Sequence, residues 1–195
     1  MDISLGTVNG LVKECLAEGY IAEKENGKEK HLILLEKGKE LLKPYKVDGA
    51  LIIAAGFGSR FVPLTFETPK GLLEVFGERM IERQIKQLHE VGIYDITIAV
   101  GYLKEKFEYL IDKFDVKLLY NPEYSCKNTL ATVYRARKFL KGRNVYILSS
   151  DNWMRENMYH SYECGAWYSA AHEEGETKEW CLTFNKKGRI SDVNV

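Results

Sequence analysis

The chain has 195 residues, and its 28 basic and 28 acidic side chains give a formal net charge of zero at pH 7. This balance argues against a global preference for nucleic acid or a membrane surface, and the length allows one large domain or two smaller ones. No apolar run approaches the roughly 20 residues of a membrane span, and no signal-peptide pattern opens the chain, so we expect a cytoplasmic protein without a membrane partner. The four cysteines lack C-x-x-C spacing, which argues against a zinc site and fits reduced thiols.

The first 47 residues predict a helix, a hairpin and a second helix. Ser4 can cap a helix whose apolar residues recur at helical spacing, and an Asn-Gly pair favours a turn between two short strands. Pro44 stops the second helix. The predicted elements are a helix at 4–18, strands at 20–23 and 31–35, and a helix at 36–42.

The string ISLGTVNGLVKECLAEGYI, at residues 3–21, resembles the recognition helix of bacterial winged helix-turn-helix domains, with Lys28 and Lys30 on the wing. We therefore interpret residues 1–47 as a partial winged helix-turn-helix segment, without the helices that normally precede a recognition helix. Its eight lysines are matched by eight acidic residues, whereas contact with the DNA backbone usually needs a basic excess. DNA binding is one interpretation of this segment, and a regulatory appendage of the rest of the chain is the other.

The next stretch, residues 49–70, reads GALIIAAGFGSRFVPLTFETPK. A short apolar run bounded by glycines predicts a strand buried on both faces, as in a parallel sheet covered by helices. Gly56 and Gly58 allow a tight turn whose N–H groups can bind anionic oxygens, and Arg60 and Lys70 add positive charge. The turn is therefore predicted to bind the phosphates of a nucleoside triphosphate.

This loop differs from the two commoner glycine-rich phosphate motifs. Position 61 is Phe61 where G-x-G-x-x-G needs glycine, and the loop has no Gly-Lys-Ser or Gly-Lys-Thr. It resembles instead the signature A-A-G-x-G-[ST]-R-x-x-P-L-T, followed by P-K, of nucleotidyltransferases that join an NTP to a phosphorylated small molecule. A turn with incidental basic residues is the alternative, but it would not match so many positions in order. The matching residues are Ala54, Ala55, Gly56, Gly58, Ser59, Arg60, Pro63, Leu64, Thr65, Pro69 and Lys70.

Strands and helices alternate after the loop, which predicts a mostly parallel sheet with helices on both faces. We therefore predict an α/β fold with a Rossmann-like sheet of the nucleotidyltransferase type over residues 48–195. Ligands of such sheets bind at the carboxyl ends of the strands, where the glycine loop also lies. The predicted elements are strands at 95–100, 116–120 and 144–150, and helices at 78–91, 103–114 and 128–140.

Asp151 follows the apolar strand at residues 144–150, at the same edge of the sheet as the loop. A carboxylate there is well placed to hold Mg²⁺, which prefers one or two carboxylates together with phosphate oxygens and water. The family resemblance likewise implies that an Asp at this point binds the metal. A cap on the following helix or turn is the alternative role for Asp151.

The resemblance implies a reaction in which the acceptor phosphate attacks the α-phosphorus of the NTP and expels pyrophosphate. Positioning and charge neutralisation supply most of the catalysis of such a reaction. Arg60 would neutralise the leaving pyrophosphate, Lys70 would bridge the α-phosphate and the acceptor phosphate, and Asp151 would hold Mg²⁺. The predicted nucleotide-binding residues are Ala54, Ala55, Gly56, Phe57, Gly58, Ser59, Arg60, Asn128 and Thr129.

Two further features favour one branch of this family. Asn128 and Thr129 open a helix after the string at 120–124, YNPEY, where they can contact a base or ribose, although an N-cap explains Asn128 equally well. This region resembles choline-phosphate cytidylyltransferases more than the enzymes that make sugar nucleotides. Trp153 can offer an aromatic face to a quaternary ammonium group. We therefore predict Lys70 and Trp153 as acceptor-binding residues.

The predicted function is a cytidylyltransferase that couples CTP to phosphocholine, giving CDP-choline and pyrophosphate with Mg²⁺ as cofactor. One alternative is a sugar-1-phosphate nucleotidyltransferase that makes an NDP-sugar. The other is a transcriptional regulator that uses a degenerate nucleotidyltransferase domain as a ligand sensor.

The end of the chain predicts strands at residues 165–171 and 179–185, and a hairpin turn at 186–188 that leads into 189–195. Members of the resembled family continue past this hairpin and bring a second metal-binding Asp from the later part. We therefore expect either a chain truncated at both ends or a divergent remnant of this family.

Overall fold

The computed structural model describes residues 3–27, 29–170, 172, 174–177 and 180–194. The chain divides into two compact units, at residues 1–164 and 165–195. Every helix among the described residues is too short or too polar to span a bilayer. The domain boundary that the sequence predicts between residues 47 and 48 lies within the first unit, and it stays a prediction.

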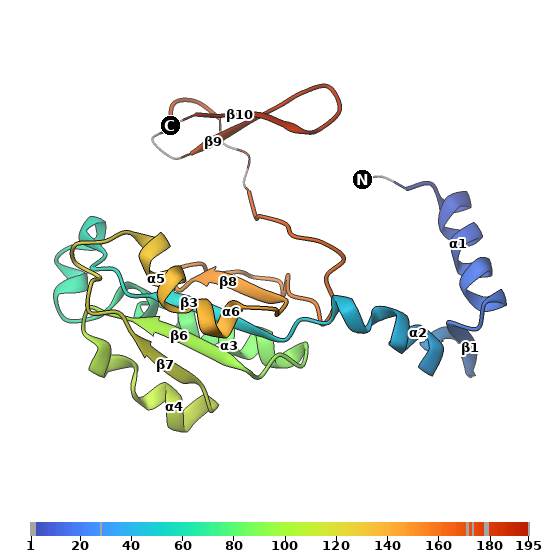
Figure 1. The fold of residues 1–195 in the computed structure, drawn as a ribbon, viewed down its shortest axis with the longest axis horizontal. Helices are drawn as coiled ribbons and strands as arrows, with labels where there is room; N and C mark the ends of the chain where they lie inside the picture. The colour runs from blue at the N-terminus through green and yellow to red at the C-terminus, as the bar shows by residue number, and fades with distance from the viewer. Residues whose placement is uncertain (1–2, 28, 171, 173, 178–179, 195) are drawn as a thin grey trace. The chain divides into compact units, whose positions relative to one another are not determined.

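A parallel sheet of four described strands forms the centre of the first unit (Figure 1). Its order is β7-β6-β3-β8, and each neighbouring pair runs parallel. Strand β3 is the apolar run before the glycine loop, and its Leu51 and Ile52 are completely buried, as expected for a strand covered on both faces. The predicted α/β fold is confirmed. The strands are β3 (Gly49–Ala54), β6 (Ile96–Val100), β7 (Lys117–Tyr120) and β8 (Val145–Ser149).

Helices cover both faces of this sheet (Figure 1). On one face, Ile81 of α3 and Leu110 of α4 belong to the same buried cluster as Ile52. On the other face, Leu51 packs in a cluster with Ala136, at the junction of α5 and α6. This alternation follows from the strand, since successive side chains point to opposite faces. The helices are α3 (Met80–Glu90), α4 (Tyr109–Phe114), α5 (Thr129–Arg135) and α6 (Arg137–Leu140), the last two replacing the single helix predicted at 128–140.

The connection from β3 to α3 carries the loop and a small hairpin. Three short 3₁₀ turns occupy residues 59–61, 64–66 and 70–72, and strands β4 (Glu74–Val75) and β5 (Glu78–Arg79) then pair antiparallel. Glu74–Val75 is thus the first arm of a hairpin. Phe76 and Gly77 form its turn with φ angles of 52° and 76°.

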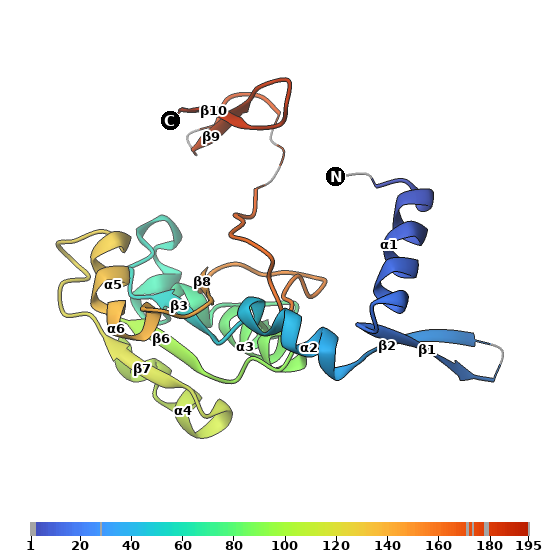
Figure 2. The same cartoon turned by 45° about the vertical axis from the view of Figure 1, so that its right-hand side comes forward.

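The helix, hairpin and helix predicted for the first 47 residues are present (Figure 2). Ser4 caps the first helix, because its Oγ accepts a hydrogen bond from the Thr7 N–H at 3.2 Å. Both strands are longer than predicted because their backbones pair in register over their whole length. The elements are α1 (Leu5–Ala17), β1 (Ile21–Asn26), β2 (Glu29–Leu34) and α2 (Glu36–Leu42).

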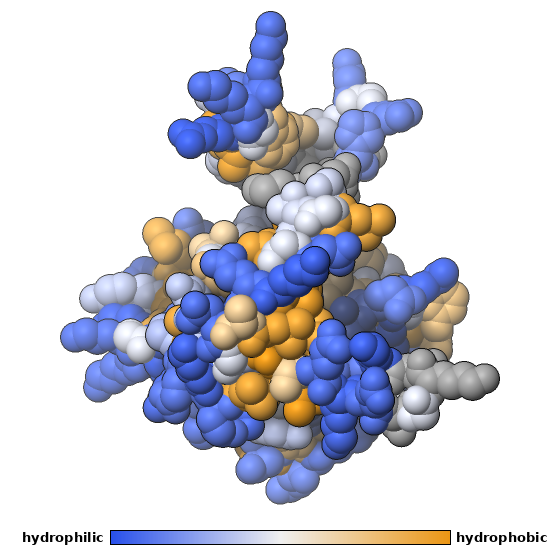
Figure 3. Space-filling view, turned by 90° about the vertical axis from the view of Figure 1, so that its right-hand side faces the viewer, coloured by the Kyte–Doolittle hydropathy of each residue, from blue (hydrophilic) through white to orange (hydrophobic). Residues whose placement is uncertain are grey.

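This N-terminal segment exposes many apolar side chains beside its charged ones. None of the described residues of α1 is buried, and hydrophobic residues lie at the surface in the view from that side (Figure 3). Lys30 pairs with Glu23 at 3.1 Å, and Lys28 lies outside the described residues. DNA contact by the winged segment therefore stays a prediction. The exposed hydrophobic side chains include Leu5, Val8, Leu11, Leu32, Ile33 and Leu34.

Among its described residues, the second unit contains a hairpin formed by β9 (Cys181–Phe184) and β10 (Ile190–Asn194). Its turn lies at the predicted place, where the Gly188 N–H donates to the Asn185 carbonyl at 2.9 Å. The strand predicted at 165–171 is wrong for residues 165–170, and residue 171 lies outside the described residues. A strand needs a neighbour for its backbone groups, and an aromatic-rich sequence alone does not supply one.

Candidate active site

The loop after β3 is held by a glycine that no other residue could replace without strain. Gly58 has a φ of 71°, and a Cβ there would lie 3.1 Å from Thr65 Cγ2 and 3.4 Å from Lys70 Cβ. Its carbonyl accepts hydrogen bonds from the Phe61 N–H at 2.9 Å and from Thr65 Oγ1 at 3.0 Å. Thr65 is completely buried. The threonine of the P-L-T string thus fixes the loop from inside the protein.

Tyr102, which follows the neighbouring strand β6, supports the start of the loop. The Tyr102 N–H donates to the Ala55 carbonyl at 3.2 Å, and the Tyr102 hydroxyl donates to the Phe66 carbonyl at 3.0 Å. The Phe57 ring meets the Tyr102 ring edge-on, with centroids 4.7 Å apart. Tyr102 follows β6, so the segment after this strand supports the loop that follows the adjacent strand β3. Tyr102 has no counterpart in the motif, and sequence reasoning missed it.

Lys70 and Asp151, which are 81 positions apart, form a direct ion pair in which Lys70 Nζ contacts Asp151 Oδ2. Gly71 makes the approach possible, since a Cβ at this glycine would lie 2.7 Å from Ser150 Cβ. The Ser149 hydroxyl donates to the other oxygen of Asp151. Both charged side chains keep 23% of their surface exposed, so a ligand can reach them.

Asp151 is held in its charged form. Burial alone would raise the pKa of its carboxyl group, but the hydrogen bonds from Lys70 and Ser149 outweigh burial and place the pKa below its ordinary value. The group is therefore ionised at neutral pH. A carboxylate oxygen has lone pairs beyond those used here, so Asp151 can also bind a cation.

Arg60 and the backbone of the loop lie on the same connection. Arg60 is exposed and belongs to the 3₁₀ turn Ser59–Phe61, which begins directly after Gly58. Lys70 Nζ lies over the Phe61 ring, 4.5 Å from its centroid. The loop thus presents positive side chains and main-chain N–H groups, a combination suited to a polyphosphate.

The remaining predicted site residues have structural contacts of their own. Asn128 Oδ1 accepts a hydrogen bond from the Leu130 N–H at 3.2 Å, so this side chain caps α5, and Thr129 is exposed in its first turn. The Arg83 guanidinium lies 4.8 Å from the centre of the Trp153 ring, and the Phe76 ring lies 5.2 Å away. A cation already occupies one face of Trp153.

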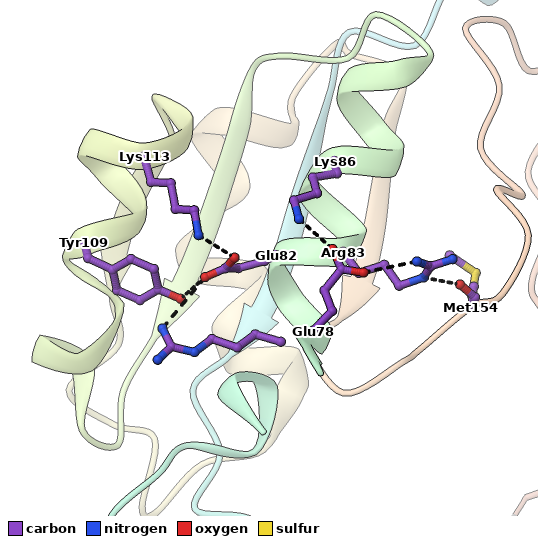
Figure 4. A network of polar contacts seen from close by, with 8 residues as sticks. Glu78, Glu82, Arg83, Lys86, Tyr109, Lys113 and Met154 are labelled. Carbon is purple, nitrogen blue, oxygen red and sulfur yellow. Dashed lines mark hydrogen bonds and ion pairs between the residues drawn. The ribbon is translucent and has the colours of Figure 1, made fainter. Parts of the chain in front are cut away.

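A separate polar network ties α3 to α4 (Figure 4). Glu82 accepts hydrogen bonds from the Tyr109 hydroxyl and from Lys113 Nζ, each at 2.7 Å. Burial alone would raise the pKa of Glu82, but these two donors bring it below its ordinary value. The hollow beside this network measures about 480 Å³, and another of about 420 Å³ lies near Tyr120; neither is lined by Lys70 or Asp151. The contacts of Glu82 therefore join α3 to α4 and do not reach Lys70 or Asp151.

Comparisons with known proteins agree with this geometry. A family model described as "Nucleotidyl transferase" matches residues 49–174. The choline-phosphate cytidylyltransferase of Streptococcus pneumoniae is 38% identical over 146 residues, which are 75% of this chain and 63% of that protein. The 2-aminoethylphosphonate cytidylyltransferase of Lancefieldella rimae is 36% identical over 143 residues, which are 72% of this chain and 58% of that protein.

A solved structure gives the same result for the fold. The CTP:phosphocholine cytidylyltransferase from Streptococcus pneumoniae superposes with a TM-score of 0.70 at 38% identity, over 76% of this chain and 64% of that chain. The chain thus spans somewhat less than two thirds of the length of these relatives.

Proposed function

The chain belongs to the nucleotidyl transferase family, and we propose that it acts as a cytidylyltransferase that joins CTP to phosphocholine, giving CDP-choline and pyrophosphate. The relatives named above that are 36 to 38% identical transfer a cytidylyl group, according to their names. This likeness favours CTP over UTP or dTTP as the nucleotide.

The ion pair between Lys70 and Asp151 beside the glycine loop is the observation that carries this proposal. Lys70 and Asp151 are both partly exposed and pair with each other, but the proposed reaction would offer each of them a different partner. Phosphate oxygens would take over Lys70, and a divalent cation would take over Asp151. Each charge thus keeps the other in place until the substrates replace it.

The proposed chemistry forms a bond between a phosphate oxygen of the acceptor and the α-phosphorus of CTP, while the bond from that phosphorus to the β-phosphate oxygen breaks. Main-chain N–H groups of residues 56–60 would bind the β- and γ-phosphates. Arg60 would neutralise charge on the departing pyrophosphate, and Lys70 would lie between the α-phosphate and the acceptor phosphate. Such preorganised charges commonly supply the largest part of catalysis.

The residues present fit Mg²⁺ shared with a nucleotide. No three carboxylate, imidazole or thiol side chains cluster into a metal site among the described residues, so a permanently bound metal is not indicated. Mg²⁺ commonly uses one or two carboxylates and completes its shell with phosphate oxygens and water. Asp151 would supply the carboxylate, and the bound ion would add positive charge to the phosphate oxygens.

Phosphocholine and 2-aminoethylphosphonate differ in the group that Trp153 would meet. A quaternary ammonium binds to aromatic faces because it donates no ordinary hydrogen bond, whereas a primary ammonium donates three. Since Arg83 occupies one face of Trp153, a trimethylammonium group would use the other face. The second relative makes 2-aminoethylphosphonate the alternative acceptor.

A product assay tests the function directly. The full chain is incubated with Mg²⁺ and CTP plus phosphocholine, CTP plus 2-aminoethylphosphonate, or UTP or dTTP plus a hexose 1-phosphate, and products are followed by ³¹P NMR. We expect CDP-choline and pyrophosphate to form in equal amounts and faster than any other product. Faster formation of an NDP-sugar would contradict the proposal. Binding of CTP without product from any pair would favour a ligand sensor.

A further inference from the structure

Asp151 stands on a turn just beyond the end of the sheet. The Ser150 N–H donates to the Ile53 carbonyl at 3.0 Å, a bond that still joins this segment to β3. The next link is a turn in which the Asn152 N–H approaches the Ser149 carbonyl at 3.4 Å, with Ser150 and Asp151 at its centre. Because this turn bond is long, the strand alone does not fix the direction of the Asp151 side chain.

One side chain of α3 holds both ends of that turn. Gln84 Nε2 donates to the Ser149 carbonyl at 2.8 Å and to the Asn152 carbonyl at 2.6 Å. An amide nitrogen carries two donors in one plane, so a single group can fix two carbonyls at a set separation. The two acceptors also dictate the orientation of the amide, since the reverse orientation would place its oxygen against both carbonyl oxygens.

Burial of the Gln84 amide costs free energy, which packing alone does not explain. Gln84 is only 1% exposed, and its Oε1 is buried without a hydrogen-bond partner among the described residues. A methionine of similar length would fill the same space without an unpaired polar atom. The amide is therefore explained by the two carbonyls that it holds.

The neighbouring polar residues of α3 hold a later part of the same segment. Arg83 Nε donates to the Met154 carbonyl at 2.6 Å, and Gln87 Nε2 donates to the same carbonyl at 3.2 Å. Gln87 resembles Gln84 in chemistry and burial, with 4% exposure and an unpartnered buried Oε1 among the described residues. The carbonyl that Gln87 holds nevertheless belongs to Met154, three residues after Asp151.

We propose that Gln84 is a positioning residue for Asp151, which its amide holds toward Lys70 by fixing the carbonyls on either side of the carboxylate. The inference rests on the proposed function for what Asp151 does there. In this proposal α3 sets the direction of the Asp151 side chain, although the helix carries none of the loop residues.

Paired variants of the full chain separate positioning from packing. Gln84→Met removes both donors while keeping the length of the side chain, and Gln87→Met is the matched control on the same helix. Binding of Mn²⁺ with CTP is measured by electron paramagnetic resonance, with Asp151→Asn as the reference for loss of the carboxylate. Steady-state assays then give kcat, the KM for CTP and the Mg²⁺ concentration at half activation.

We expect Gln84→Met to weaken Mn²⁺ binding and lower kcat by about 10- to 100-fold, as is typical when a residue that orients a metal ligand is lost. The KM for CTP should change much less, and Gln87→Met should resemble the unsubstituted chain in each measurement. Equal effects of the two methionine variants, or Mn²⁺ binding unchanged in Gln84→Met, would overturn the inference. Mn²⁺ binding that Asp151→Asn leaves intact would also overturn it.

The Mn²⁺ measurement keeps this inference distinct from the proposed function. If the unsubstituted chain binds Mn²⁺ through Asp151 but makes no product, the proposed function fails while the positioning result still stands or falls on Gln84→Met. Should that variant fail to fold, Gln84→Glu retains the shape and regains one donor when protonated. We then expect the ratio of the Mn²⁺ affinity of Gln84→Glu to that of Asp151→Asn, measured at the same pH, to rise as the pH falls. A ratio that does not change with pH would overturn the inference.

Discussion

Replacing Lys70 with alanine is expected to lower kcat for CDP-choline formation by roughly 100- to 1,000-fold, the usual loss when one group that stabilises transition-state charge is removed. The KM for CTP should change far less, because the loop N–H groups and Arg60 would still bind the β- and γ-phosphates. Lys70 contributes mainly where negative charge increases, between the α-phosphate and the incoming oxygen. Steady-state kinetics with varied CTP measure both constants.

The control for this substitution is Lys104→Ala. Lys104 is also a lysine stacked on an aromatic ring, with its Nζ 4.1 Å from the centre of the Tyr120 ring, but among the described residues it contacts neither Asp151 nor the loop. Its loss should leave kcat unchanged. A Lys70→Ala protein with an undiminished kcat would remove Lys70 from the mechanism.

Asp151→Asn is expected to lower kcat by a similar factor of roughly 100 to 1,000, again through loss of charge that acts on the transition state. Unlike Lys70→Ala, this substitution should also abolish saturable activation by Mg²⁺, because asparagine is a much weaker ligand for this ion. Titration of activity with Mg²⁺ distinguishes the two variants. The exposed Asp112 on α4 provides the control Asp112→Asn, and an Asp151→Asn enzyme that Mg²⁺ still activates normally would contradict the assignment.

Asp151→Asn should also change how the free energy of unfolding depends on pH in the acidic range. The pKa of Asp151 is lowered in the folded chain, so the ionised carboxylate stabilises the fold at pH values above its ordinary pKa of 3.8. This contribution is lost as the pH falls through the lower folded value. We therefore expect the free energy of unfolding, taken from unfolding curves, to decrease less in Asp151→Asn than in the unsubstituted chain as the pH is lowered below about 4.

The loop and the sheet could be predicted because their signals are local. Six apolar residues before paired glycines indicate a buried strand and a turn, and the position of Asp151 after an apolar strand places it at the same edge of a parallel sheet. The motif predicts Lys70 in the same pocket, whereas its direct ion pair with Asp151 is a finding of the structure. The Gly58 carbonyl and the Thr65 hydroxyl meet within seven residues, so a motif can record them together.

The supporting contacts could not be predicted because they join distant parts of the chain. Gln84 lies 65 positions from Ser149 and 68 from Asn152, and its sequence neighbours suggest only one buried face of a helix. A polar residue next to that face, near Ile81 and Ile85, was the available signal, but it does not identify the acceptor. The strand predicted at 165–171 is wrong over residues 165–170 for a related reason, since composition does not reveal whether a partner strand is present.

A crystal structure of the full chain with CTP and Mg²⁺ tests the central claim most directly. We expect the triphosphate against the N–H groups of residues 56–60, Lys70 on the α-phosphate, the metal on Asp151, and the ion pair between Lys70 and Asp151 opened. A nucleotide bound elsewhere, with Lys70 still paired to Asp151, would contradict it.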